Sequence, residues 1–314
     1  MTYMAEVLEQ RNLEDEVIRT LLYFDIFRYP LKADEVFRFL RSNGVGLDHV
    51  KDALDELVTQ RKVFRFENLY SLHNDIRNVE RRIRGNDRAR KLSPFAQRRG
   101  RLISKFPFVR AVMASGSFSK DYMDEHSDLD FFVVTEPGKL WIARTLLVLF
   151  KRVAFLNSHK YFCINYYVDE EHLEIEEKNL FTATELATLI PLFNTPVYET
   201  LLASNPWIRQ VFPNFTPRLA VRSLSNRTPV IKRLAEVVLR PFATRLERAC
   251  MRLTLQRFHR MYRNDYSETE FGIAFKSKNY TSKNHPKNYQ RKVMEQYDEK
   301  LRHYFSQRSI APQT

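Results

Sequence analysis

The stretch that decides the fold is FVRAVMASGSFSKDYMDEHSDLDFFVV, residues 108–134. Its first apolar run, 109–114, ends in a Ser-Gly-Ser turn, and its second apolar run, 131–134, follows Asp128-Leu129-Asp130. Short apolar runs bounded by turn residues are typical of buried β-strands. The pattern therefore predicts two strands, joined by a turn and a short loop that begins after Ser117.

The two aspartates of this stretch are spaced to act together. Alternate residues of a strand face the same side, so we expect Asp128 and Asp130 to project together. Two carboxylates this close repel each other unless a metal ion neutralises them. Gly116 allows a close approach of the backbone, and the Gly116-Ser117 turn can present N–H groups to a phosphate. The spacing thus favours a site for a divalent cation and a phosphate, whereas an isolated Asp-x-Asp is more often a surface turn.

This combination resembles the signature of the nucleotidyltransferase superfamily, which includes DNA polymerase beta and the minimal nucleotidyltransferases. That signature is an apolar strand, Gly-Ser, about ten residues, and then Asp-x-Asp flanked by apolar residues. Gly116, Ser117, Asp128 and Asp130 match it position by position. The resemblance covers roughly residues 100–175. The Arg-Gly that commonly follows Gly-Ser in the minimal subfamily is absent here.

The superfamily carries a third carboxylate on a later strand that is reached through a helix. The resemblance puts that helix at 138–155 and that strand at 161–168. The best-matching position is Asn165, a neutral ligand that cannot act as a base. Asp169 lies four residues further on and would have the same facing on an ideal strand, so it is the alternative third position.

The resemblance implies an enzyme that transfers a nucleoside monophosphate from a nucleoside triphosphate, with ATP favoured, to an acceptor hydroxyl. Asp128 and Asp130 would hold Mg²⁺ or Mn²⁺. Gly116 and Ser117 would hold the terminal phosphates, with Lys120 as an added point charge. RNA, a protein, a small molecule and a sugar all remain open as acceptors. Because of Asn165, the alternative is a catalytically weakened relative that binds a nucleotide or a protein partner.

Residues 1–74 predict three helices followed by a hairpin, an order that resembles a winged helix-turn-helix. Such modules usually place their third helix in the major groove of DNA. Here that helix is acidic, with Asp48, Asp52, Asp55 and Glu56 against Lys51 and Arg61. Acidic side chains oppose binding to phosphates, so we expect packing against a neighbour rather than sequence-specific DNA binding. A winged-helix DNA-binding regulator is the less favoured third function.

The overall prediction is an α+β protein of three parts. The winged-helix-like domain spans 1–74, a nucleotidyltransferase core with a mixed sheet and a basic leading helix spans 75–176, and a mainly helical domain spans 177–314. The leading helix carries nine arginines within 76–105, either as a solvated face or as a surface for anions. A basic amphipathic helix over 231–261, kinked at Pro241, suits core packing, a membrane surface or a partner protein.

Composition narrows the class of protein. The 314 residues include 44% hydrophobic residues, which excludes collagen-like and wholly disordered chains. A net charge of +13 favours anionic partners without choosing among them. Two distant cysteines and an acidic N-terminus without an apolar core predict a reducing, cytoplasmic setting. The apolar run 140–156 contains Arg144, Lys151 and Arg152, which favours a buried helix over a transmembrane segment.

Overall fold

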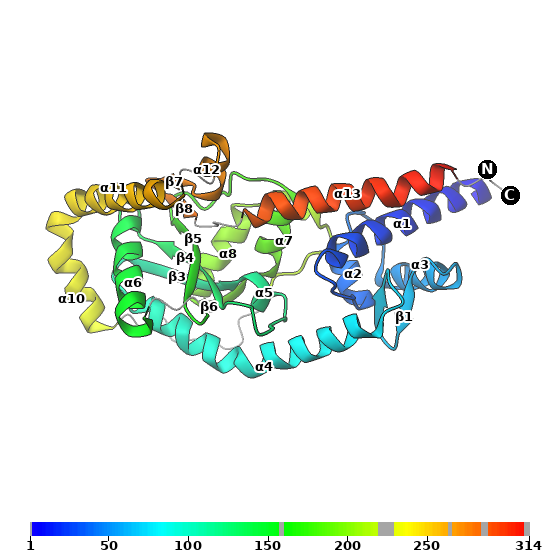
Figure 1. Cartoon of the computed structure of the whole chain (residues 1–314), viewed down its shortest axis with the longest axis horizontal. Coiled ribbons are helices and arrows are strands. Elements are labelled where there is room, and N and C mark those ends of the chain that lie inside the picture. The colour runs from blue at the N-terminus through cyan, green and yellow to red at the C-terminus, as the bar shows by residue number, and fades with distance from the viewer. Residues whose placement is uncertain (1, 157–159, 219–228, 263–265, 284–287, 311–314) are drawn as a thin grey trace.

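The protein has a mixed α+β fold built on one six-stranded sheet with helices on both faces (Figure 1). This computed structural model describes residues 2–156, 160–218, 229–262, 266–283 and 288–310. The six strands, in spatial order across the sheet, are β6 (Ile190–Phe193), β3 (Val109–Ser115), β4 (Asp130–Thr135), β5 (Cys163–Asp169), β8 (Thr281–Lys283) and β7 (Ser277–Lys278).

The sheet is mixed, as the sequence predicted. Strands β4 and β5 run parallel, and every other neighbouring pair is antiparallel. A parallel pair needs a crossover connection, and α6 (Leu140–Phe155) supplies it at the place where the helix was expected. The other helices that pack on the sheet are α4 (Ile76–Ser104), α7 (Leu180–Thr188), α8 (Thr195–Ala203), α9 (Trp207–Val211) and α11 (Ala243–Tyr262).

Strand β4 is buried on both faces, which explains why its sequence is almost continuously apolar. Phe131 and Val133 point into a core that also takes side chains from α4, α6 and α11. Phe132 and Val134 point into a second core that takes side chains from α7, α8 and α9. The period of two along a strand thus separates the two cores. Asp130, two residues before Phe132, lies on the α7 side.

Residues 1–74 contain the predicted elements in the predicted order. They are α1 (Thr2–Asp25), α2 (Ala33–Phe39), α3 (Leu47–Thr59), β1 (Phe64–Phe66) and β2 (Leu69–Ser71), the last two forming an antiparallel hairpin. On α3, Asp48, Asp52 and Asp55 are exposed, while Lys51 pairs with Asp48 at 2.8 Å. The acidic surface of this helix supports the expectation that the module does not bind DNA sequence-specifically. That expectation stays a prediction.

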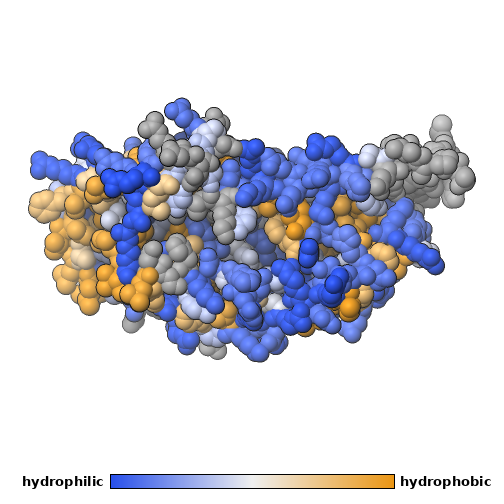
Figure 2. Space-filling view, in the orientation of Figure 1, coloured by the Kyte–Doolittle hydropathy of each residue, from blue (hydrophilic) through white to orange (hydrophobic). Residues whose placement is uncertain are grey.

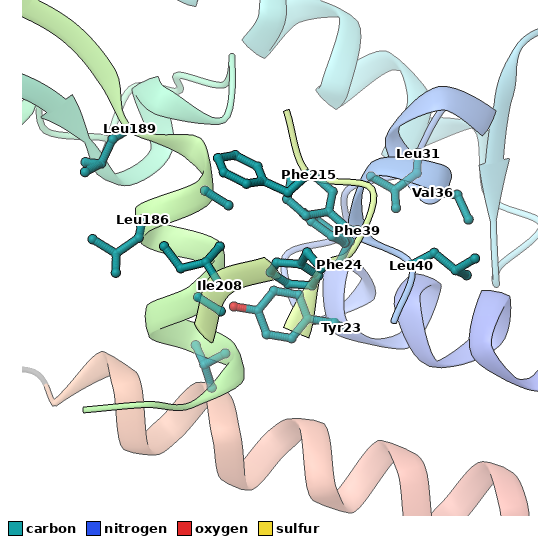
Figure 3. Packing of buried hydrophobic residues seen from close by; sticks show 14 of the residues in the cluster. Tyr23, Phe24, Leu31, Val36, Phe39, Leu40, Leu186, Leu189, Ile208 and Phe215 are labelled. Carbon is teal, nitrogen blue, oxygen red and sulfur yellow. The ribbon is translucent and has the colours of Figure 1, made fainter. Parts of the chain in front are cut away.

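The core of this N-terminal module continues into the rest of the protein. Figure 3 shows Tyr23, Phe24 and Phe39 meeting Ile208 and Phe215, which follow β6 in sequence. The rings of Phe39 and Phe212 pack edge to face at 5.4 Å. One buried core therefore extends across the boundary at residue 74. Apolar packing against later parts of the chain holds the N-terminal module in place.

The arginine-rich segment forms one long helix, α4, which runs from the hairpin to the far end of the sheet (Figure 1). Many of its arginines have partners. Arg82 is buried, pairs with Glu35 at 2.8 Å and lies 4.4 Å from the ring centroid of Tyr29. Ion pairs also hold Arg77, Arg81, Arg84, Arg88 and Arg90. Much of the charge of this helix is thus engaged within the fold.

Residues 177–314 are mainly helical, but they also give the sheet three strands, β6, β7 and β8, that the sequence did not indicate. Without β6 and β8, β3 and β5 would present unpaired edges. The break at Pro241 is confirmed: α10 (Val230–Leu239) and α11 are separated by a 3₁₀ turn, η1 (Arg240–Phe242). The remaining helices are α12 (Glu268–Ala274) and α13 (Tyr289–Ile310).

No helix in the described part of the chain is long and apolar enough to cross a membrane.

Candidate functional site

The candidate site lies at the sheet edge where β3 ends and β4 begins. Ser115, the last residue of β3, pairs with Asp130, the first residue of β4. The chain then turns at Gly116 into α5 (Gly116–Ser119), with a φ of +65°. A Cβ at Gly116 would lie 2.3 Å from Oδ2 of Asp130. The glycine therefore permits a contact between turn and carboxylate that no other residue allows.

Replacing Gly116 with alanine is expected to destabilise the protein and to weaken cation binding at Asp130. Gly138 provides a matched control, because it has the same φ of +65° and an added methyl group there would have no atom within 4 Å. Both substitutions carry the backbone cost of about 1–2 kcal/mol. Only Gly116→Ala adds the clash with Asp130, so urea unfolding and Mn²⁺ titration should separate the two variants. Equal effects in both would show that the contact is unimportant.

Only Asp130 of the pair lies on a strand, because β4 begins at Asp130 and Asp128 precedes it. The negative charge of Asp128 nevertheless acts on Asp130. Leu129 between them is buried at 1% exposure. The pKa of Asp130 is raised to about 7, first by burial and then by the negative charge of Asp128. Charge crowding of this kind is what a bound cation would relieve.

Asn165 faces Asp130 from the neighbouring strand, β5. Phe131 pairs with Ile164 and Phe132 with Tyr166, so Asn165 is the extra residue of a β-bulge. Its Nδ2 donates a hydrogen bond to Oδ1 of Asp130 at 2.6 Å. Bulges re-aim side chains next to functional sites. Asn165 thus lies beside Asp130, and its role as a third ligand position remains a prediction.

Asp169, the alternative third position, does not lie at the site. It pairs with Thr135 at the opposite end of β4 from Asp130. Four residues at about 3.3 Å each put it roughly 13 Å along the strand from Asn165. Its carboxylate instead accepts from the backbone N–H of Glu171 at 3.1 Å and contacts Nδ1 of His172 at 2.7 Å. Equal facing on a strand does not help a ligand when it is displaced along the strand.

Lys120 and Ser117 are both in or beside the turn. Ser117 is partly exposed within α5. The Nζ of Lys120 donates to the carbonyl of Gly116 at 3.1 Å and pairs with Oε1 of Glu185 at 2.6 Å. The lysine is thus placed for a phosphate at the turn, but an incoming phosphate would compete with Glu185 for it.

Two residues of the site were missed as site residues by the sequence analysis. Glu185 comes from α7, which covers the face of the sheet on which Asp130 lies, and its charge also raises the pKa of Asp130. Cys163 donates its thiol to Oδ1 of Asn165 at 3.1 Å, and burial raises the pKa of that thiol. Alternation along β5 could have indicated Cys163, but no local signal marks Glu185.

Comparison with known proteins adds nothing to this picture. No protein-family model, curated protein or solved structure matches the chain.

The donor set suits a cation that shares its ligands with a bound anion. Within the described residues, no three or more His, Cys, Asp or Glu side chains form a metal-binding group. Asp128 and Asp130 supply two carboxylates, and a triphosphate would have to supply further oxygens. Mg²⁺ fits this pattern, since it is commonly held by one or two carboxylates plus substrate phosphates.

Proposed function

We propose that this protein is a nucleotidyltransferase that transfers a nucleoside monophosphate from a nucleoside triphosphate to an acceptor hydroxyl. The supporting observation is the setting of Asp130. Its carboxylate lies against the Gly116 turn, accepts a hydrogen bond from Asn165 and has a pKa raised by burial and by the neighbouring charge of Asp128. Such a carboxylate pair beside a glycine turn fits a cation bound with a triphosphate.

In this proposal Asp128 and Asp130 hold Mg²⁺ or Mn²⁺. When bound, the metal supplies charge neutralisation at the triphosphate and a lowered pKa for the attacking hydroxyl. Gly116 and Ser117 place the turn against the terminal phosphates, and Lys120 adds a positive charge there. Positioning and electrostatic stabilisation by these groups would then supply most of the rate enhancement, as in phosphoryl transfer generally.

Asn165 favours a second candidate, a protein that binds the nucleotide and transfers it slowly or not at all. A neutral amide cannot accept the proton of an acceptor hydroxyl. Its Nδ2–H also occupies Oδ1 of Asp130, and its own Oδ1 accepts from Cys163. Both polar atoms of the amide are therefore already hydrogen-bonded. Because the amide is neutral, the site offers less negative charge than three carboxylates would.

Incubation of the full-length protein with labelled nucleoside triphosphates and Mg²⁺ or Mn²⁺ tests the proposal. RNA, protein, sugar and small-molecule hydroxyls serve as acceptors in separate reactions. We expect label transfer or pyrophosphate release, abolished by Asp128→Ala and retained by Asp87→Ala, which removes an acid on α4. Nucleotide binding without turnover would favour the second candidate. Transfer that survives Asp128→Ala would contradict both.

A further inference from the structure

Helix α10 packs on the protein with its polar face inward and its apolar face toward solvent. Five of its apolar residues are between 61% and 81% exposed. They are Val230, Ile231, Leu234, Val237 and Val238. Lys232 and Glu236, by contrast, are buried. This is the reverse of an ordinary amphipathic helix, whose apolar stripe faces the core.

Specific polar contacts fix this orientation. The Nζ of Lys232 donates to the carbonyl of Ser104 at 2.9 Å and to the carbonyl of Val109. Glu236 accepts from the backbone N–H of Phe108 at 2.7 Å and pairs with Arg110 at 2.9 Å. Charged groups are buried only when they are paired, so rotating α10 to hide its apolar face would leave these groups without partners. The apolar face is therefore held outward.

The exposed apolar face of α10 continues at the turn into the next helix. Phe242 of η1 is 60% exposed and Leu253 of α11 is 65% exposed. Figure 2 shows apolar side chains gathered at the end of the molecule where α10, α6 and α11 lie. Contiguous apolar surface of this kind marks an interaction site.

The same helices are basic toward solvent. Both acidic residues of 230–262 are turned to the protein: Glu236 is buried, and Glu247 accepts from the backbone N–H groups of Trp141 and Ile142 at 2.8 and 2.9 Å. The exposed arginines of these helices are Arg233, Arg240, Arg245, Arg248, Arg252, Arg257 and Arg260. An apolar face flanked by arginines, with no exposed acid on these helices, is complementary to a partner that has a negatively charged surface and an apolar interior.

We infer that α10 and the outer face of α11 dock on the surface of an anionic lipid bilayer. Interfacial helices combine an apolar face, which enters the boundary between headgroups and acyl chains, with basic residues that meet anionic headgroups. A second copy of the chain fits less well, because two such faces would bring like-charged arginines together. Nucleic acid fits less well, because exposed aliphatic side chains gain little from phosphates.

Vesicle sedimentation of the full-length protein tests the inference. Vesicles of phosphatidylcholine with phosphatidylglycerol are compared with pure phosphatidylcholine, and we expect binding to the anionic vesicles that weakens with salt. The double variant Ile231→Asn, Val238→Asn should bind roughly tenfold more weakly or worse, since each buried CH₂ contributes to partitioning. Replacing Arg233, Arg245 and Arg252 with glutamine should cost about fivefold per arginine.

The matched control is Ile76→Asn, Ile83→Asn, which removes two exposed isoleucines from α4. It should bind vesicles like the unchanged protein, and circular dichroism checks that every variant is folded. Three results would overturn the inference: no binding of the folded protein to anionic vesicles, an equal loss in the control variant, or binding that depends on the arginines alone. A dimer in sedimentation velocity that the α10 variant dissociates would assign the face to a second copy instead.

Discussion

Replacing Asn165 with aspartate is expected to strengthen Mn²⁺ binding by about tenfold or more and to destabilise the metal-free protein above pH 7. The new carboxylate would take the place of an amide whose Nδ2 lies 2.6 Å from Oδ1 of Asp130. Two like charges about 4 Å apart repel by about 4 kcal/mol at an effective dielectric constant of 20. A bound cation converts that repulsion into attraction, and about 1.4 kcal/mol of it gives a tenfold gain in affinity.

Mn²⁺ titration in the presence of a non-hydrolysable nucleoside triphosphate measures the affinity, and urea unfolding with and without Mn²⁺ measures the stability. Asn165→Ala is the control, because it removes the hydrogen bond without adding charge. The alanine variant should show no gain in affinity. If Asn165→Asp binds Mn²⁺ no better than the alanine variant, the residue is a structural partner of Asp130 and not a ligand position.

The metal-free protein is expected to lose stability as the pH rises from about 4 to about 7, through the titration of Asp130. Its pKa is about 7 in the folded protein against an ordinary value of 3.8, mainly because of burial and the charge of Asp128. Between these values the folded state holds a proton that the unfolded chain has released, so unfolding becomes easier with rising pH. Above pH 7 the loss is complete.

Asp130→Asn should remove this loss. The variant should equal the unchanged protein near pH 4 and exceed it at pH 8, by an amount on the order of a few kcal/mol. It should also lose Mn²⁺ binding, whereas the unchanged protein should bind Mn²⁺ more weakly below pH 7, where the cation must displace the proton. Urea unfolding over pH 4–8 measures the effect, with Asp87→Asn as the control. A slope that is the same in Asp130→Asn and in the control would exclude Asp130 as the titrating group.

The geometry at Asp130 could be predicted from sequence because it is mostly local. The strand, the glycine turn and the Asp-x-Asp pair lie within 27 residues, and the alternation along a strand fixes which side chains share a face. The partner from β5 required knowledge of which strand lies beside β4 and of the bulge at Asn165. The resemblance supplied the neighbour, but ideal strand geometry also admitted Asp169, which the parallel register excludes.

Other features depend on tertiary packing and leave little trace in the sequence. Glu185 reaches the site only because α7 packs on the Asp130 face of the sheet. Strands β6 and β8 have four and three residues, too few to show a clear period of two. The sequence predicted a helix where α10 lies. Periodicity cannot tell which face of that helix turns inward. In α10 the buried contacts of Lys232 and Glu236 turn the polar face inward, whereas a helix usually turns its apolar face to the core.

The pairing of α1 with α13 has a consequence for the order of synthesis. The two helices lie side by side (Figure 1). Tyr297 donates to the carbonyl of Arg19 at 3.3 Å, Lys300 pairs with Asp25 at 2.6 Å, and the ring of Tyr297 packs on Tyr23. Helix α1 is translated long before α13, which packs on it. A nascent chain on the ribosome would present the side of α1 that packs on α13, including Tyr23, to chaperones until the segment carrying α13 has left the exit tunnel.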